Sequence, residues 1–99
     1  MPDERRKDER LSINLAVRWD GSSGAHETRI EDISMGGCFV NTPARVDVGE
    51  VISLELRLPS GEWLPLRGEV TAFQPGIGFG MEFTFLTEEE DEALRNLLS

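Results

Sequence analysis

An acid, a hydroxyl and two glycines fall within six residues in the stretch Asp32-Ile33-Ser34-Met35-Gly36-Gly37. Asp32 can accept hydrogen bonds, and Ser34 can both donate and accept them. The glycine pair indicates a bulge or bend at the edge of a strand, because glycine adopts positive φ at no steric cost. Such a bend leaves the Ser34 hydroxyl outside the strand ladder and lets another molecule approach the main chain. Taken alone, however, the stretch is more typical of an ordinary strand-to-strand turn.

A basic cluster lies near the amino terminus, where four of the ten Lys and Arg residues occupy positions 5–10. Within it, Arg6 and Arg10 have the spacing R-x-x-x-R, and Arg5 precedes the pair. The net charge of the whole chain is -9. A local basic cluster on so acidic a protein suits a small anion better than DNA, RNA or an anionic membrane. Taken alone, this cluster is typical of a solvated charged arm.

The two motifs together, R-x-x-x-R followed about 22 residues later by D-x-S-x-x-G, resemble the PilZ family of bacterial cyclic di-GMP receptors. The resemblance covers nearly the whole chain. It implies a six-stranded barrel with a carboxy-terminal helix and a role as a cytoplasmic second-messenger receptor. The ligand-binding residues that it implies are Arg5, Arg6, Arg10, Asp32, Ser34, Gly36 and Gly37.

The chemistry of these residues suits a bis-guanylate. An arginine guanidinium matches the O6 and N7 acceptors of guanine, stacks on bases and pairs with phosphate, so Arg6 and Arg10 can hold one guanine and neutralise phosphate. Asp32 is a natural acceptor for the N–H donors on the other edge of guanine. Ser34 can bond phosphate or base, and Gly37 allows close approach. In the family an arginine at the position of Arg5 goes with a self-stacked pair of ligand molecules.

Alternating apolar residues predict the strands of the barrel. Period-two patterns cover Ile13–Trp19, about 26–32, 37–41, Ile52–Leu58 and Trp63–Phe73. Leu64, Leu66, Val70 and Ala72 are expected on the inner face of the long strand, where Pro65 indicates an edge or a bulge. A last strand places Phe79, Met81, Phe83 and Phe85 in the core. If Ile30 faces inward, Asp32 points the same way unless the bend reorients it.

A short amphipathic helix is predicted over residues 87–98. Thr87 and Glu90 form a capping box, and the acids at 88–92 favour the helix dipole rather than forming a metal site. Ala93, Leu94, Leu97 and Leu98 form a stripe that docks on the barrel. The chain is thus expected to be all-β with one helix: an arginine-rich arm at 1–11 and a barrel domain at 12–99.

Several functions are disfavoured by composition. One cysteine, Cys38, and one histidine, His26, cannot build a Cys/His metal site, and His26 has no evident catalytic partner. There is no nucleophile–base pair and no phosphate loop, so no catalytic residues, no metal and no cofactor apart from the ligand are expected. No apolar run is long enough to cross a bilayer, and the amino terminus is no signal peptide.

The expected mechanism is an arm that closes over cyclic di-GMP and presents a new surface to a separate downstream protein. One alternative is an interaction module of the same fold that does not bind nucleotide. Another is an oligonucleotide-binding barrel, which would carry aromatic residues on an exposed strand face; here the aromatic residues follow core positions.

Overall fold

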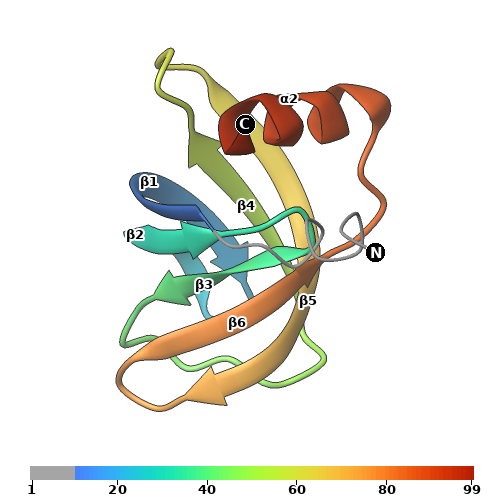
Figure 1. Ribbon diagram of the computed structural model, residues 1–99. Coiled ribbons are helices and arrows are strands. Elements are labelled where there is room, and N and C mark those ends of the chain that lie inside the picture. The colour runs from blue at the N-terminus through green and yellow to red at the C-terminus, as the bar shows by residue number, and fades with distance from the viewer. Residues whose placement is uncertain (1–10) are drawn as a thin grey trace, which may run out of the picture.

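The computed structural model describes residues 11–99, so Arg5, Arg6, Arg10 and the rest of the predicted arm lie outside the described residues. Six antiparallel strands close into a barrel in the order β1-β2-β3-β6-β5-β4, and one helix follows them (Figure 1). The predicted fold class is therefore confirmed. The elements are β1 (Leu11–Gly21), β2 (Gly24–Ile33), β3 (Gly37–Asn41), β4 (Val51–Arg57), β5 (Trp63–Gln74), β6 (Gly78–Phe83) and α2 (Glu88–Leu98). Leu11, expected at the end of the arm, is the first residue of β1.

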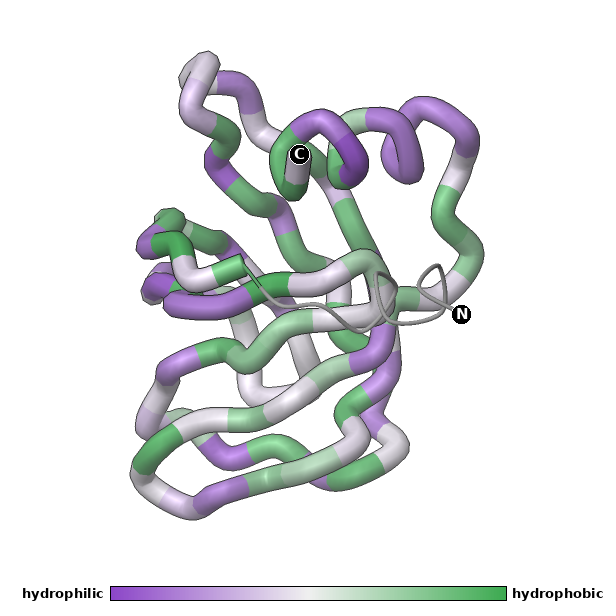
Figure 2. Tube along the Cα trace, viewed as in Figure 1, coloured by the Kyte–Doolittle hydropathy of each residue, from purple (hydrophilic) through white to green (hydrophobic). Residues whose placement is uncertain are grey.

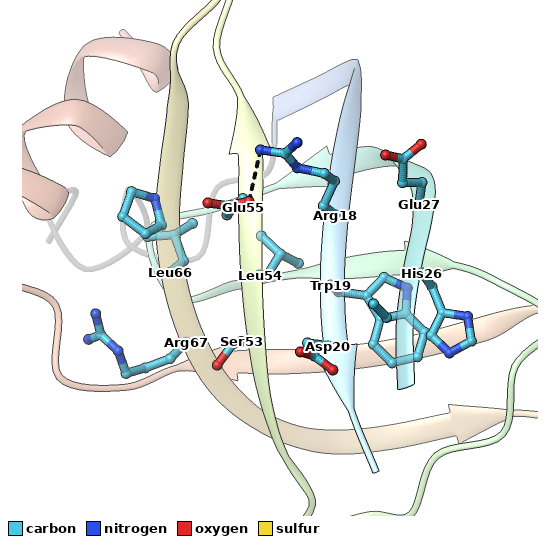
Figure 3. A pocket seen from close by; sticks show the side chains of 12 residues that line it. Arg18, Trp19, Asp20, His26, Glu27, Ser53, Leu54, Glu55, Leu66 and Arg67 are labelled. Carbon is cyan, nitrogen blue, oxygen red and sulfur yellow. Dashed lines mark ion pairs between the residues drawn. The ribbon is translucent and has the colours of Figure 1, made fainter. Parts of the chain in front are cut away.

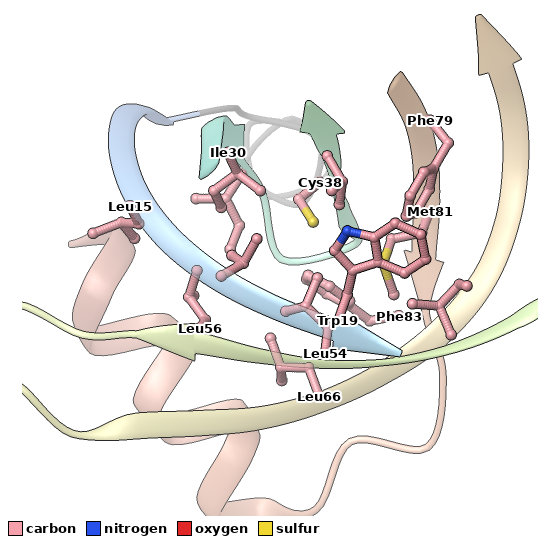
Figure 4. Close-up of a cluster of buried hydrophobic side chains, with 14 of the residues drawn as sticks. Leu15, Trp19, Ile30, Cys38, Leu54, Leu56, Leu66, Phe79, Met81 and Phe83 are labelled. Atoms are coloured by element: carbon pink, nitrogen blue, oxygen red, sulfur yellow. The ribbon is translucent and has the colours of Figure 1, made fainter. Parts of the chain in front are cut away.

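Strand alternation builds a single core, as the hydropathy pattern along the strands in Figure 2 illustrates. Trp19 lies in the middle of this core, 1% exposed, with its ring edge-on to Phe79 at 5.1 Å between centroids (Figure 4). His26, the cross-strand partner of Trp19, stacks on the indole at 4.3 Å. His26 thus covers part of the core, and this packing explains why the hairpin carries a histidine.

The long strand β5 differs from its prediction in one place. Leu64, Leu66 and Val70 are buried as expected, but Ala72 is exposed because a register shift between Val70 and Ala72 resets the alternation. Pro65 lies in the half of β5 that pairs only with β4, since pairing with β6 begins at Gly68. The expectation of an edge position for Pro65 is therefore confirmed, because no ladder bond is needed from its missing N–H.

Phe85 is the clearest error of the strand predictions. Strand β6 ends at Phe83, and Phe85 is 86% exposed with φ of 52° instead of buried in the core. A non-glycine residue in this left-handed region costs roughly 1 kcal/mol or more. The Arg67 guanidinium offsets that cost, because its NH1 donates to the Phe85 carbonyl at 2.7 Å. The alternation of apolar residues continues in the sequence to Phe85, but strand β6 ends at Phe83.

The helix α2 begins as predicted. Thr87 is the N-cap, its hydroxyl accepts from the Glu90 N–H at 3.1 Å, and the Glu90 carboxylate accepts from the Thr87 N–H at 3.1 Å. Leu94 is fully buried, and Ala93, Leu97 and Leu98 pack against the core as the stripe predicted. The helix contacts β5 (Figure 1). None of the described helices is long and apolar enough to cross a membrane.

Candidate functional site: the turn between β2 and β3

The D-x-S-x-x-G motif forms the turn that joins β2 to β3, next to the start of β1. Leu11 lies opposite Ile33 in the β1–β2 ladder, and Ser12 lies opposite Asp32. Leu11 directly follows Arg10 in the sequence, while Arg10 itself lies outside the described residues. Strand pairing therefore brings the start of β1 beside the D-x-S-x-x-G turn, although 20 residues lie between Leu11 and Asp32 along the chain.

Asp32 does not share a face with Ile30. The β2–β3 register shifts between Ile30 and Ile33, and both of these isoleucines are fully buried while Asp32 is half-buried. The expected bend is therefore present, and it reorients Asp32 away from the barrel interior. A carboxylate held at the rim in this way stays accessible to a ligand without the large desolvation cost of a buried charge.

Ser34 holds the turn from within. The residue is 6% exposed, and its hydroxyl accepts from the N–H groups of Gly36 and Gly37 at 3.2 and 3.3 Å. The hydroxyl also lies 3.3 Å from the Gly37 carbonyl, which accepts a 2.8 Å bond from the Ser34 N–H. These bonds are those of a side chain that stabilises a turn. In this structure, then, the Ser34 hydroxyl supports the site's shape rather than pointing from it.

The structure requires glycine at only one of the two motif positions, Gly36 and Gly37. Neither has positive φ, so the expected conformational reason is wrong for both. A Cβ at Gly37 would lie 2.0 Å from the Met81 carbonyl oxygen, so β6 can approach only a residue without a side chain. A Cβ at Gly36 would meet only the Ser34 hydroxyl, at 3.9 Å. Gly37 is therefore required by the fold, and Gly36 is not.

The turn is tied to β6 and, beyond it, to α2. The Phe83 N–H donates to the Gly36 carbonyl at 2.8 Å, and the next residue, Thr84, donates to the Arg67 carbonyl at 2.9 Å. The Arg67 side chain then pairs with Glu90 at 3.0 Å, and Glu90 is 7% exposed. The sequence analysis did not single out Arg67. The signal that could have found it is a single basic residue on β5 that can pair with Glu90, the acid of the capping box.

A hollow in the described surface lies away from the motif turn. It has a volume of about 760 Å³ and spans neighbouring segments of β1, β2, β4 and β5 (Figure 3). Of the motif residues that the structure describes, Asp32, Ser34, Gly36 and Gly37, none lines it. Its two arginines are engaged, because Arg18 pairs with Glu55 at 2.9 Å and Arg67 pairs with Glu90. Within residues 11–99, no three His, Cys, Asp or Glu side chains gather as metal ligands.

Comparison with known proteins identifies the family. The PilZ domain family model matches residues 4–99, which include both motifs. Similar solved structures include the PilZ domain of CeSA from a cellulose-synthesizing bacterium, at 22% identity and TM-score 0.71. The match covers 91% of this chain and 94% of that one. The PilZ domain of YcgR from Escherichia coli with c-di-GMP is 12% identical, with TM-score 0.75 and coverage of 91% and 86%.

A third similar structure is the Borreliella burgdorferi PlzA protein in complex with c-di-GMP, at 17% identity and TM-score 0.57. All of this chain is covered, but only 38% of PlzA. At these identities the likeness in structure shows the shared fold alone. The comparison with curated proteins gives no match. The family assignment rests on the family model, which spans almost the entire sequence, and the chain belongs to the PilZ domain family.

Proposed function

We propose that the protein is a cyclic di-GMP receptor that binds its ligand between the arginine segment and the β2–β3 turn. The observation that carries this proposal is the pairing of Leu11 with Ile33, since it brings the start of β1, which directly follows the arginine segment in the sequence, beside the β2–β3 turn. Arginine guanidinium groups would donate to phosphate and to the O6 and N7 edge of guanine, and the Asp32 carboxylate would accept from the N–H groups on its other edge. The YcgR and PlzA structures, in which PilZ proteins hold c-di-GMP, support the same ligand class.

The proposed role is that of a receptor and adaptor in the cytoplasm. Ordering a segment costs about 1–2 kcal/mol for each residue that is fixed, so several charge-assisted contacts to the ligand are needed to close residues 1–10 over it. The closed segment then forms a surface that a separate downstream protein reads. Arg5 favours binding of two ligand molecules as a stacked pair.

Calorimetric titration with cyclic di-GMP tests the proposal, with GTP and the linear dinucleotide as controls. We expect saturable heat with cyclic di-GMP alone and a stoichiometry of two per chain. Arg6→Ala and Arg10→Ala should each weaken binding by about 2 kcal/mol or more, because a charge-assisted contact is lost. The melting temperature should stay unchanged in both variants. Wild-type affinity in both would contradict the assigned site.

A non-binding interaction module of the same fold is the second candidate. It is favoured by the bonds of the Ser34 hydroxyl and by the close contact of Gly37 with β6, since these give the motif a structural purpose that needs no ligand. No heat at tens of micromolar cyclic di-GMP would favour this module. Saturable binding would leave the receptor as the function.

A further inference from the structure

Two of the ten glycines have no structural reason to be glycine. Five adopt positive φ, and three others would place a Cβ within 2.7 Å of another atom; the two groups are Gly24, Gly49, Gly61, Gly76 and Gly78, and Gly21, Gly37 and Gly68. Gly36 and Gly80 fall in neither group, because the nearest atoms to their added Cβ lie at 3.9 and 3.8 Å. Glycine in a strand interior is unfavourable in itself, so an unforced glycine such as Gly80 needs another explanation.

Both unforced glycines lie along the ladder between β3 and β6. The Gly36 carbonyl accepts from Phe83, and Gly80 lies opposite Phe39. Gly80 and Phe83 are three residue positions apart on β6, which corresponds to about 10 Å along a strand. That span is of the order of a base and its attached sugar. A ligand held at the β2–β3 turn can therefore extend along this ladder as far as Gly80.

The outer surface here, which we call the β3–β6 wall, consists of the outward-facing residues Phe39, Asn41, Gly80 and Glu82. The inward residues alternate with them and include Cys38, Val40 and Met81, all buried. The Phe39 ring leans over the glycines of β6, because its Cε2 lies 2.8 Å from an added Cβ at Gly78 and its Cδ1 lies 3.9 Å from one at Gly80. At its centre the wall thus consists of the half-buried Phe39 ring next to the backbone of Gly80, which carries no side chain.

The charge on this wall selects the part of a nucleotide that fits it. Glu82 is exposed and is the next outward residue of β6 after Gly80. Its carboxylate disfavours a phosphate but can accept from the N–H donors of a guanine. An aromatic ring and a flat glycine backbone offer stacking to a base. The wall therefore suits a neutral purine ring, and the arginine segment is left to contact the phosphates.

We propose that one guanine of the bound bis-guanylate lies flat against the β3–β6 wall, over Gly80 and beside the Phe39 ring. This inference rests on the proposed function and adds a contact surface to it that neither sequence motif includes. Gly80 is glycine because a side chain there would occupy the place of the base. Phe39 supplies the apolar and aromatic edge, and Glu82 lies within the same wall as an acceptor.

Gly80→Val is the test, because a Cβ at Gly80 has space and a β-branched residue suits a strand. We expect this variant to bind cyclic di-GMP about tenfold or more weakly while its melting temperature stays equal or rises. Phe39→Leu, which keeps an apolar cover over Gly78 but loses the ring, should weaken binding by several-fold. Ser53→Val introduces the same side chain at an exposed, outward position of β4 and should bind like wild type.

The outcomes separate this inference from the function on which it rests. Wild-type protein that gives no heat with cyclic di-GMP would overturn both. Wild-type binding that persists unchanged in Gly80→Val would overturn the stacking surface and leave the receptor function standing. If Gly80→Val did not fold, Gly80→Ala and Phe39→Leu would decide, and unchanged affinity in both would overturn the stacking surface.

Discussion

Side chains on neighbouring strands contact one another on one side of the barrel, whereas on the other side the backbone is bare. On the first side, the β1–β4 wall of Arg18, Asp20, Ser53 and Glu55, the Arg18 guanidinium pairs with Glu55 and lies 3.8 Å from the Trp63 ring centroid. On the β3–β6 wall, Phe39 faces a glycine. The Arg18 guanidinium thus has an ionic and an aromatic partner among its neighbours, whereas Gly80 leaves space for a ligand beside Phe39.

The largest effect is expected when one methyl group is added at each motif glycine, in Gly37→Ala and Gly36→Ala. Gly37→Ala places a Cβ 2.0 Å from the Met81 carbonyl, and the backbone of β3 or β6 must move. We expect a loss of about 2–4 kcal/mol in the free energy of unfolding, measured by urea denaturation. Gly36→Ala meets only the Ser34 hydroxyl at 3.9 Å and should change stability by less than about 0.5 kcal/mol.

The matched pair decides whether the β2–β3 turn contains one glycine that the fold requires and one that it does not. Equal losses in Gly36→Ala and Gly37→Ala would mean that both are required by the fold and would remove the argument for an unforced glycine. A stable Gly36→Ala that also binds cyclic di-GMP less tightly would place the ligand close to the turn. Circular dichroism of both variants checks that the β-sheet signal is retained before any binding is compared.

The sequence could predict the barrel because its strands are buried on one face only. Alternation from Ile13 to Trp19 and from Ile52 to Leu56 marked the core correctly. Alternation could not show where the β6 ladder stops, however, because that point depends on a bond from Arg67, 18 residues earlier, to the Phe85 carbonyl. Phe85 was misassigned to the core for this reason.

The candidate site was predictable in part. Asp32 and Ser34 were singled out from their spacing, and the structure places both at the junction of β2 and β3, next to the start of β1. The roles of Gly36 and Gly37 could not be separated from sequence, because only the register with Met81 distinguishes them. Phe39 and Gly80 were missed, since an aromatic residue between two buried neighbours is more typical of an ordinary strand.

A second prediction concerns the completeness of the β1–β4 wall. The Arg18 and Glu55 side chains are 42% and 47% exposed, so their ion pair should contribute about 0.2–1 kcal/mol, and less at high salt. A double-mutant cycle with Arg18→Met and Glu55→Gln measures this coupling. A parallel cycle with Arg18→Met and Trp63→Leu should give about 0.5–1 kcal/mol for the cation–π contact.

The affinity for cyclic di-GMP should also be measured for the variants of the two double-mutant cycles, because it tests whether the ligand contacts the β1–β4 wall. None of the variants on the β1–β4 wall should change the affinity for cyclic di-GMP, because the β1–β4 pair and the β3–β6 pair lie apart in the barrel order. A weakened affinity in Arg18→Met would show that the wrong wall had been assigned to the ligand. Salt-insensitive coupling between Arg18 and Glu55 would instead indicate that the pair is shielded from solvent.

The smallest expected effect lies at Glu50, which links loops that follow β1 and β3. Its carboxylate accepts from the Asp47 N–H at 3.0 Å and from the Ser22 N–H at 2.7 Å. These two backbone donors, Asp47 first, lower the pKa of Glu50 below its ordinary value of 4.5. A lowered pKa in the folded state means that the carboxylate stabilises the protein above the ordinary value, and that this stability is lost as the pH falls below it.

Thermal melts between roughly pH 6 and pH 3 for wild type and Glu50→Gln measure this contribution. At pH 6 the wild type should melt slightly higher, because the charged acceptor forms stronger bonds to the two N–H groups than an amide does. The difference should shrink on acidification as Glu50 is protonated. Glu62→Gln, which removes an exposed carboxylate at the β4–β5 turn, controls for the general effect of one charge on so acidic a chain. A gap that stayed constant across this pH range would show that the ionised Glu50 carboxylate does not stabilise the two loops, since protonation of Glu50 would then leave the difference unchanged.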